Sequence, residues 1–460
     1  MINFFRKNGQ KNKEFMIAFF IISFLQLDAQ NDVYRADQDV VLQLIRNDKI
    51  DLVLPKAMRD NKIDMWIHTG RHGDPNPLEY EFGIIDGFLI FTDTGEKIER
   101  AMFGGIFTGS GGVEKIDHFG SEEVSRAFGG YDPFNIKISA FDEIRKYVEN
   151  CDPQTIAVNY SNWLAVADGI SHTQFELLKK IIGSKYSERI VSAENLITDF
   201  RSRRLLREIV IQANTLEVAR QNTMNILSQI QPGVTSIGDL PYANLLYSSS
   251  SGMKNLGNTD YTLQRGDFFY VNGVSNWMNF GHTRFSEDTK YYGYILEEGE
   301  TKMPKELQYA YEQAIKGQWI MRPTIQVGKK AGDVLAAMIK SMKDEGYIYT
   351  PFTDNGTKDR EIIRKALSNT DKSGFSVDLH VQGNNNGELI TVGASMAPFR
   401  RDRDHLILKE NHIFAFEYMV HTNMPGREQP LSINISNVQA LTNLGVEWIQ
   451  PPNKEVYLIH

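Results

Sequence analysis

Residues 263–285, LQRGDFFYVNGVSNWMNFGHTRF, begin with a Gly-Asp turn and continue into a segment rich in aromatic and β-branched residues. Such a segment predicts a strand, and the period of two places Asn272 on the same face as Phe268 and Tyr270. The stretch has the outline of a catalytic strand pair. At the positions where a catalytic site would use carboxylates, however, it carries Asn272 and Gly281.

Three later segments, residues 375–381, 412–420 and 431–441, are also rich in β-branched and aromatic residues and are bounded by Gly, Asn and Pro clusters. We predict one continuous strand for each of them. The alternation of faces then places Glu417 among apolar residues, and burying such a carboxylate is costly unless it is paired. By the same rule Asp378 shares a face with His380.

Length and composition indicate a globular protein with two ordinary domains. The chain has 460 residues, of which 41% are hydrophobic and 23% charged. The formal net charge of -8 argues against a general nucleic-acid binder, because phosphate neutralisation needs a basic surface. We therefore expect no nucleic-acid partner. The single cysteine, Cys151, excludes an intrachain disulfide.

Residues 1–29 have the pattern of a secretory signal peptide. A basic start is followed by an apolar run at residues 15–25 and by a small-residue exit near Ala29. The apolar run is about half of the roughly 20 residues needed to span a bilayer. An uncleaved anchor or a buried helix is the alternative. We expect a secreted or periplasmic bacterial protein with no membrane span after signal removal.

The rest of the chain divides into two parts. Residues 36–200 alternate helix-like and strand-like segments, which predicts an α/β domain. Residues 204–460 contain long helix-favouring segments at 205–229 and 304–322, each stopped by Pro and Gly. Each of these helices leads through a turn into a predicted second helix, and the repeated pattern suggests an internal duplication.

The order of these elements resembles the creatinase/aminopeptidase, or pita-bread, family of methionine aminopeptidases, Xaa-Pro aminopeptidases, prolidases and creatinases. The landmarks are Leu263-x-x-Gly266-Asp267 before a strand and Phe414-Ala415-Phe416-Glu417 in a late strand. The first half resembles the N-terminal domain of the aminopeptidase P and prolidase branch, so the resemblance covers nearly all of the mature chain. It implies an α/β N-terminal creatinase-like domain, an α+β pita-bread C-terminal domain, and a homodimer.

The resemblance also implies where a site would lie. Peptidases of the family hold two divalent metals with two Asp, one His and two Glu, and the metals bridge a hydroxide that attacks the scissile carbonyl. Carried onto this chain, the ligand positions are Asn272, Gly281, Ser373, Glu417 and Ser436. The two substrate-facing histidines fall at Asn255 and His380, and the usual Asp-x-Thr-Arg run becomes Gly281-His282-Thr283-Arg284. One metal ligand in five is retained.

The loss of these carboxylates predicts the loss of the metals. Two divalent ions beside Glu417 alone would leave about three uncancelled positive charges in a dry pocket, which Coulomb's law makes prohibitive. We therefore predict no metal cofactor. A single divalent ion held by Glu417, His380 and His282 is the alternative. The substituted positions Asn255, Asn272, Gly281, Ser373 and Ser436 are predicted, together with His282 and Arg284, to line a binding pocket.

Three functions stay open at this point. The first is a secreted, non-hydrolytic relative of aminopeptidase P that binds a peptide or another small molecule. The second is a metal-independent hydrolase, as creatinases are, with Glu417 and His380 as the acid/base pair. The substrate histidine replaced by Asn255 weakens this second hypothesis. The third is a metallo-aminopeptidase with rearranged ligands.

Overall fold

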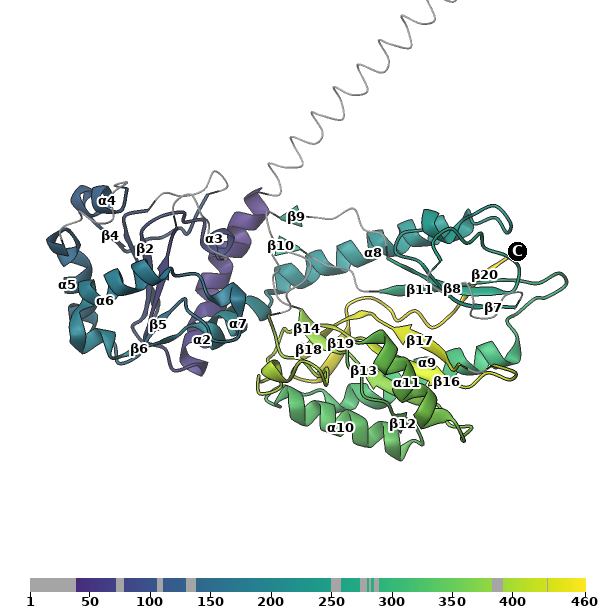
Figure 1. Ribbon diagram of the computed structural model, residues 1–460. Helices are drawn as coiled ribbons and strands as arrows, with labels where there is room; N and C mark the ends of the chain where they lie inside the picture. The colour runs from purple at the N-terminus through teal and green to yellow at the C-terminus, as the bar shows by residue number, and fades with distance from the viewer. Residues whose placement is uncertain are drawn as a thin grey trace, which may run out of the picture.

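The computed structural model of the chain describes residues 39–71, 78–105, 111–129, 138–249, 258–273, 279–280, 283–284, 289–382, 392–427 and 429–460. The predicted signal peptide lies outside the described residues. Figure 1 shows two domains side by side, and α7 of the first (Glu194–Ser202) leads into the long α8 of the second (Leu206–Ser228) where they meet. In the described part of the chain, no helix has both the length and the apolar character needed to cross a membrane.

The first domain is a three-layer α/β structure. Its six-stranded sheet has the order β4-β3-β2-β1-β5-β6. The strands are β1 (Met65–Thr69), β2 (Phe88–Asp93), β3 (Ile98–Phe103), β4 (His118–Phe119), β5 (Ile156–Val158) and β6 (Ile190–Ser192). The helices are residues 39–48, α2 (Leu54–Asp60), α3 (Glu79–Phe82), α4 (Glu122–Gly129), α5 (Asp142–Cys151), α6 (His172–Ser187) and α7. Strand β2 is antiparallel to its neighbours β1 and β3, whereas β4 runs parallel to β3, and β5 and β6 run parallel to β1.

Helices cover both faces of this sheet, because successive side chains of β1 point to opposite faces and both sets include apolar residues. Trp66 packs with Leu54 of α2 and Phe200 of α7 in one apolar cluster. Its neighbours Met65 and Ile67 pack on the opposite face with residues of α5 and α6. Because both faces are buried, most residues of β1 and β2 are apolar, as expected for a sheet that is sandwiched between helices.

The second domain contains three four-stranded sheets and four long helices among the described residues. The sheets are β20-β11-β8-β7, β12-β13-β16-β17 and β14-β15-β18-β19. The strands are β7 (Asn244–Ser248), β8 (Asp267–Asn272), β11 (Lys290–Ile295), β12 (Ile348–Tyr349), β13 (Gly374–Val377), β14 (His380–Gln382), β15 (Ile413–Ala415), β16 (Tyr418–Thr422), β17 (Leu431–Ile435), β18 (Val438–Thr442), β19 (Gly445–Trp448) and β20 (Tyr457–Ile459). The short pair β9 (Asn279–Phe280) and β10 (Thr283–Arg284) stands apart from them.

The helices of this domain are α8, α9 (Lys305–Met321), α10 (Ala331–Asp344) and α11 (Gly356–Leu367). Helix α9 lies across β16 and β17, and the Tyr418 hydroxyl donates a hydrogen bond to the Ala314 carbonyl. Gly317 makes this close approach feasible, because a Cβ there would come 2.8 Å from the Tyr418 ring. The apolar core of the domain lies between these helices and the strands.

Two of the sequence predictions about this domain are wrong. The segment after α8 contains only the 3-10 turn at Ile237–Asp239 where a second helix was predicted, whereas α9 is followed by the full helix α10. Each of the three segments predicted as one continuous strand forms two strands that belong to different sheets, β13 and β14, β15 and β16, and β17 and β18. The face assignments based on unbroken alternation at Asp378 and Glu417 therefore do not hold.

The three strand breaks lie side by side and position the candidate site. The Asp378 amide donates to the Glu417 carbonyl at 3.0 Å, and the Phe416 amide donates to the Asn437 carbonyl at 2.8 Å. These bonds continue the pairing across the point where each segment passes from one sheet to the other. Side chains at the breaks leave the regular alternation, so a polar residue here is not forced into either apolar core.

Candidate functional site

The Gly-Asp turn begins the strand that carries Asn272. Gly266 has a φ of +80°, a left-handed conformation that residues with a side chain adopt rarely. The buried Asp267 carboxylate accepts a hydrogen bond of 2.7 Å from the Gln264 amide and closes the turn. Strand β8 follows immediately and places Asn272 at its far end. Turn and strand thus form as the sequence predicts.

Glu417 lies at the strand break between β15 and β16 and is ion-paired with Lys290. The Lys290 Nζ atom is 3.0 Å from the Glu417 Oε1 atom, and the Asn434 amide donates to the same oxygen at 2.9 Å. The side chains of Lys290 and Glu417 are only 6% and 17% exposed. A charge-assisted pair in such a shielded place is much stronger than one at the surface.

Strand pairing brings Lys290 to this position. In the antiparallel pair of β8 and β11, Lys290 lies directly opposite Asn272. The Lys290 amide donates to the Ser436 carbonyl at 3.2 Å. Three of the predicted site residues, Asn272, Glu417 and Ser436, are therefore gathered around one lysine.

The charge state of Glu417 follows from these contacts. Burial opposes ionisation of the carboxyl group, but the Lys290 ammonium and the Asn434 amide outweigh burial and hold the pKa of Glu417 below its ordinary value. Glu417 is thus a carboxylate at neutral pH. The Asn272 and Asn434 side-chain oxygens are buried, and neither has a hydrogen-bond partner in the described part of the chain.

His380 is close enough to Glu417 to interact electrostatically with it. Burial is the main cause that lowers the pKa of His380 to about 4, and Arg400 lowers it further, whereas Glu417 raises it. Its Nδ1 atom is buried and has no hydrogen-bond partner among the described residues. Arg400 also lies 4.0 Å from an Asp378 carboxylate oxygen. His380 is consequently neutral at pH 7.

The other predicted site residues are less informative. Ser373 precedes β13 and its hydroxyl pairs with Thr422 at 3.0 Å, and within the described ranges no hydrogen bond joins it to Glu417. Asn255, Gly281 and His282 lie outside the described residues. Arg284 is described only as a member of the short strand β10.

The residues present do not fit a dinuclear metal centre. No group of three or more His, Cys, Asp or Glu side chains in the described ranges could hold a metal ion. The one carboxylate that is retained is already neutralised by Lys290. Asn272 and Ser436 are uncharged and offer weak ligands to the hard divalent ions that such a centre uses.

Lys290 and Asn434 are the functional residues that sequence reasoning does not single out. No motif marks either of them. One signal was available, because Lys290 begins the otherwise apolar segment KYYGYI, in which a buried lysine needs a partner. The register that pairs Lys290 with Asn272 could not be derived from the sequence, since residues 274–288 separate the two strands.

The fold of this chain is similar to that of several solved structures. The X-Pro aminopeptidase of Thermotoga maritima covers 88% of this chain and 100% of its own, with a TM-score of 0.51 and 12% sequence identity. The chain has the creatinase/aminopeptidase, or pita-bread, fold. The α/β first domain and the α+β pita-bread second domain agree with the fold class that the sequence predicts.

Two further pita-bread structures give weaker matches. An Xaa-Pro dipeptidase of Bacillus anthracis covers 91% of the chain with a TM-score of 0.48 and 15% identity, and the dipeptidase PepE of Mycobacterium ulcerans covers 91% with a TM-score of 0.49 and 12% identity. They cover 100% and 98% of their own chains, respectively. No protein-family model matches the sequence, and no curated protein matches it. At such low identity the pita-bread likeness establishes the fold and leaves the activity open.

Proposed function

We propose that this protein is an exported, non-hydrolytic relative of aminopeptidase P that binds a peptide or another small molecule without a dinuclear metal centre. The ion pair of Lys290 with Glu417 is the observation that carries the proposal. The lysine ammonium binds one of the two carboxylate oxygens with which Glu417 could coordinate a metal ion. A positive charge supplied by the chain itself removes the need for a bound cation.

Charge arithmetic supports this proposal. Glu417 and Lys290 carry -1 and +1, so the pair is neutral, and one added divalent ion would bring a net +2 into a largely buried site. Like charges a few ångströms apart in a medium of low polarity repel by several kcal/mol. The uncharged Asn272 and Ser436 cannot offset that repulsion. A single ion at Glu417 is disfavoured for the same reason.

A metal-independent hydrolase is the less favoured alternative. Such an enzyme would use Glu417 and His380 to move protons. Glu417, however, already accepts hydrogen bonds from Lys290 and Asn434, and the pKa of His380 lies near 4, far below neutrality. Neither group is poised to exchange protons at pH 7.

Metal analysis and a peptidase assay on the mature protein test the proposal together. The protein is incubated with Mn²⁺ or Zn²⁺ and desalted, the bound metal is measured by mass spectrometry, and hydrolysis of an Xaa-Pro peptide is followed. We expect less than about one metal ion per ten chains and no release of the first residue. Two bound ions per chain, or Glu417-dependent release of the first residue with or without metal, would refute the proposal.

Export and self-association form part of the same proposal. The signal-like segment at residues 1–29 supports secretion or transfer to the periplasm. Resemblance to the pita-bread family supports a homodimer. Expression of the full chain in a bacterium tests both points, because N-terminal sequencing of the exported protein locates the cleavage and light scattering gives the mass in solution. Retention in the cytoplasm would contradict export, and a mass near 52.5 kDa would contradict the dimer.

A further inference from the structure

A groove of about 530 Å³ lies on the second domain, apart from the Glu417 site. Its walls are α8, the start of β11, the start of β18 and the segment 450–455. Lys290 turns toward Glu417, and its neighbours Thr289 and Tyr291 line the groove on the other side of the strand. We refer to this feature as the amide groove, because three side-chain amides line it: Asn437, Gln450 and Asn453.

The lining of the amide groove is polar but carries no net charge. Two carboxylates, Glu217 and Glu455, balance two cations, Arg220 and Lys454. Glu217 and Arg220 are also paired with each other at 2.7 Å. A strongly charged ligand would gain little here. Side-chain amides and hydroxyls both donate and accept, which suits a ligand whose groups do the same.

Thr289 gives independent evidence that the groove is incomplete without a ligand. Its side chain is only 5% exposed and lines the groove. Its hydroxyl group is buried, and it has no hydrogen-bond partner in the described part of the protein. Buried polar groups nearly always have a partner in folded proteins, and one without a partner requires an explanation.

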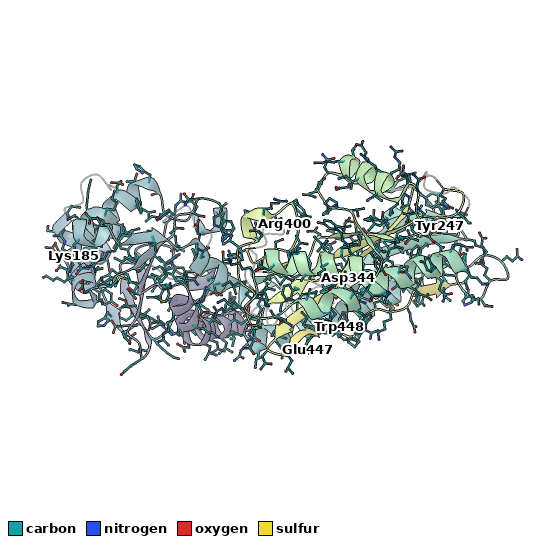
Figure 2. All side chains as sticks on the ribbon, turned by 90° about the horizontal axis from the view of Figure 1, so that it is seen from below. Lys185, Tyr247, Asp344, Arg400, Glu447 and Trp448 are labelled. Carbon is teal, nitrogen blue, oxygen red and sulfur yellow. The ribbon has the colours of Figure 1, made fainter. Side chains whose placement is uncertain are left out.

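An exposed aromatic platform adjoins the groove. Trp319 of α9 is 45% exposed, and the Lys454 ammonium, which belongs to the groove wall, lies 5.2 Å from its ring centre. The Arg322 guanidinium packs against both tryptophan rings. Its carbon atom lies 5.4 Å from the ring centre of Trp319 and 4.3 Å from that of Trp448. Figure 2 shows Trp448 beside Glu447 at the margin of the second domain. We refer to Trp319, Arg322 and Trp448 as the tryptophan platform.

A shallow depression continues the surface beyond the platform. It is lined by Trp319 together with residues of α9 and α10. Its charged lining residues are already paired. Lys316 pairs with Glu345 at 2.8 Å, and Asp344 pairs with Lys340 at 2.5 Å. Groove, platform and depression thus form one path with little net charge, and the Trp319 ring lies at its middle. Such a path fits an elongated ligand better than a compact one.

We propose that the amide groove and the tryptophan platform bind a neutral oligosaccharide. Sugar hydroxyls donate and accept hydrogen bonds. They can use the donor and acceptor positions that the amides of Asn437, Gln450 and Asn453 keep beyond their bonds within the protein, and the Thr289 hydroxyl, which has no partner among the described residues. The apolar C–H face of a sugar ring stacks on an exposed Trp ring. A proline-rich peptide also docks on aromatic rings, but the grooves that bind such peptides are lined by aromatic side chains. Tyr291 is the one aromatic residue among the described lining residues of this groove.

Calorimetric titration of the mature protein with cellohexaose, maltohexaose and chitohexaose tests this proposal. Decaproline serves as the comparison ligand. We expect at least one hexaose to bind with a submillimolar Kd, and Trp319→Ala to weaken that binding roughly tenfold. Thr289→Val should weaken it as well without lowering the unfolding temperature, because the deleted hydroxyl has no partner among the described residues.

Matched variants separate the groove from other effects. Tyr309→Ala removes an aromatic residue of the same helix with 48% exposure, away from the groove, and should leave hexaose affinity unchanged. Glu417→Gln should also leave it unchanged, so this result does not depend on the function proposed for the Glu417 site. Absence of binding by all three hexaoses, affinity that is equal in Trp319→Ala and the wild type, or Trp319-dependent binding of decaproline alone overturns the proposal.

Discussion

At the scale of single residues, Lys290 supplies the positive charge that pairs with the Glu417 carboxylate. A largely buried carboxylate is costly, and the chain satisfies Glu417 with an ammonium at 3.0 Å and an amide at 2.9 Å. The pKa of Glu417 stays low because of these partners. The stability contributed by the pair is therefore present above the unfolded pKa of a glutamate and is lost as the pH falls through the lower, folded pKa.

A double-mutant cycle measures this coupling. Lys290→Met leaves a buried carboxylate without its counter-charge, and we expect the free energy of unfolding at pH 7 to fall by about 2–4 kcal/mol. Glu417→Gln alone should cost a similar amount, because it leaves the ammonium unpaired. The double variant should recover most of the loss, as measured by urea unfolding. Losses that simply add would mean that the two groups do not interact.

At the scale of secondary-structure elements, the sequence shows which segments form strands better than it shows where one strand ends and the next begins. The segments 375–381, 412–420 and 431–441 are strands, as their β-branched and aromatic residues indicate, yet each is divided between two sheets. The breaks carry Asp378, Glu417 and Asn437, residue types that are depleted in strands. The same types also occur inside strands, as Asn434 does in β17, so they do not by themselves locate a crossover between sheets. Glu417 and Ser436 were located by resemblance. The partner of Glu417 was not, because strand register depends on contacts far along the chain.

Buried His421 joins three strands of one sheet. It lies on β16, and its two ring nitrogens pair with the Ser376 hydroxyl of β13 at 2.9 Å and the Ser432 hydroxyl of β17 at 2.7 Å. Ser376 has a second partner in Thr350, whereas Ser432 relies on the histidine among the described residues. These side-chain bonds reinforce the backbone ladder next to the Glu417 break.

Removing His421 should therefore unpair this part of the sheet. We expect His421→Leu to lower the free energy of unfolding by about 2–4 kcal/mol, because the buried Ser376 hydroxyl and the half-buried Ser432 hydroxyl each lose a partner. Adding Ser432→Ala should restore about 1 kcal/mol, since the unsatisfied hydroxyl is then gone. Chemical denaturation compares the variants. If Ser432→Ala brings no recovery in the His421→Leu background, the hydrogen bond is not the source of the loss.

At the scale of the whole molecule, a cluster of charges connects the two domains. Arg203, which follows α7, pairs with Asp60 and with Asp199, both at 2.5 Å, and Lys409 of the second domain reaches Asp60 at 2.9 Å. The Arg204 amide also donates to the Asn411 carbonyl at 3.0 Å. These contacts hold the first domain against the strands that carry the Glu417 site.

Weakening this cluster should reduce the coupling between the domains. Asp60→Asn removes the charge that Arg203 and Lys409 share, and we expect a loss of about 1–2 kcal/mol and a broader unfolding transition, because the domains then melt less cooperatively. The exposed pair Glu122–Arg126 is the control, and Glu122→Gln should change stability by less than about 0.5 kcal/mol. Calorimetry compares the two variants. Transitions of equal width would show that the cluster does not couple the domains.

Four buried histidines should make the whole molecule sensitive to acid. Burial lowers the pKa of His68, His412 and His421 to about 3 and that of His380 to about 4. An unfolded histidine has a pKa near 6.5, so between these values the unfolded chain binds more protons than the folded one. Stability is fully present above about pH 6.5 and is lost as the pH falls toward the folded pKa values. Each histidine then costs about 2 kcal/mol between pH 7 and pH 5.

His68→Gln isolates one of these contributions. The His68 Nδ1 atom accepts a 2.9 Å hydrogen bond from the Asn159 amide nitrogen. A glutamine side-chain oxygen can also accept such a bond, but glutamine does not bind a proton in this range. The wild type and the variant share every other titrating group, so the difference between their pH dependences belongs to His68. We expect the variant to lose about 2 kcal/mol less than the wild type between pH 7 and pH 5, measured by urea unfolding. Equal losses would show that His68 is protonated with an ordinary pKa, and its burial in the sheet would then have to be reconsidered.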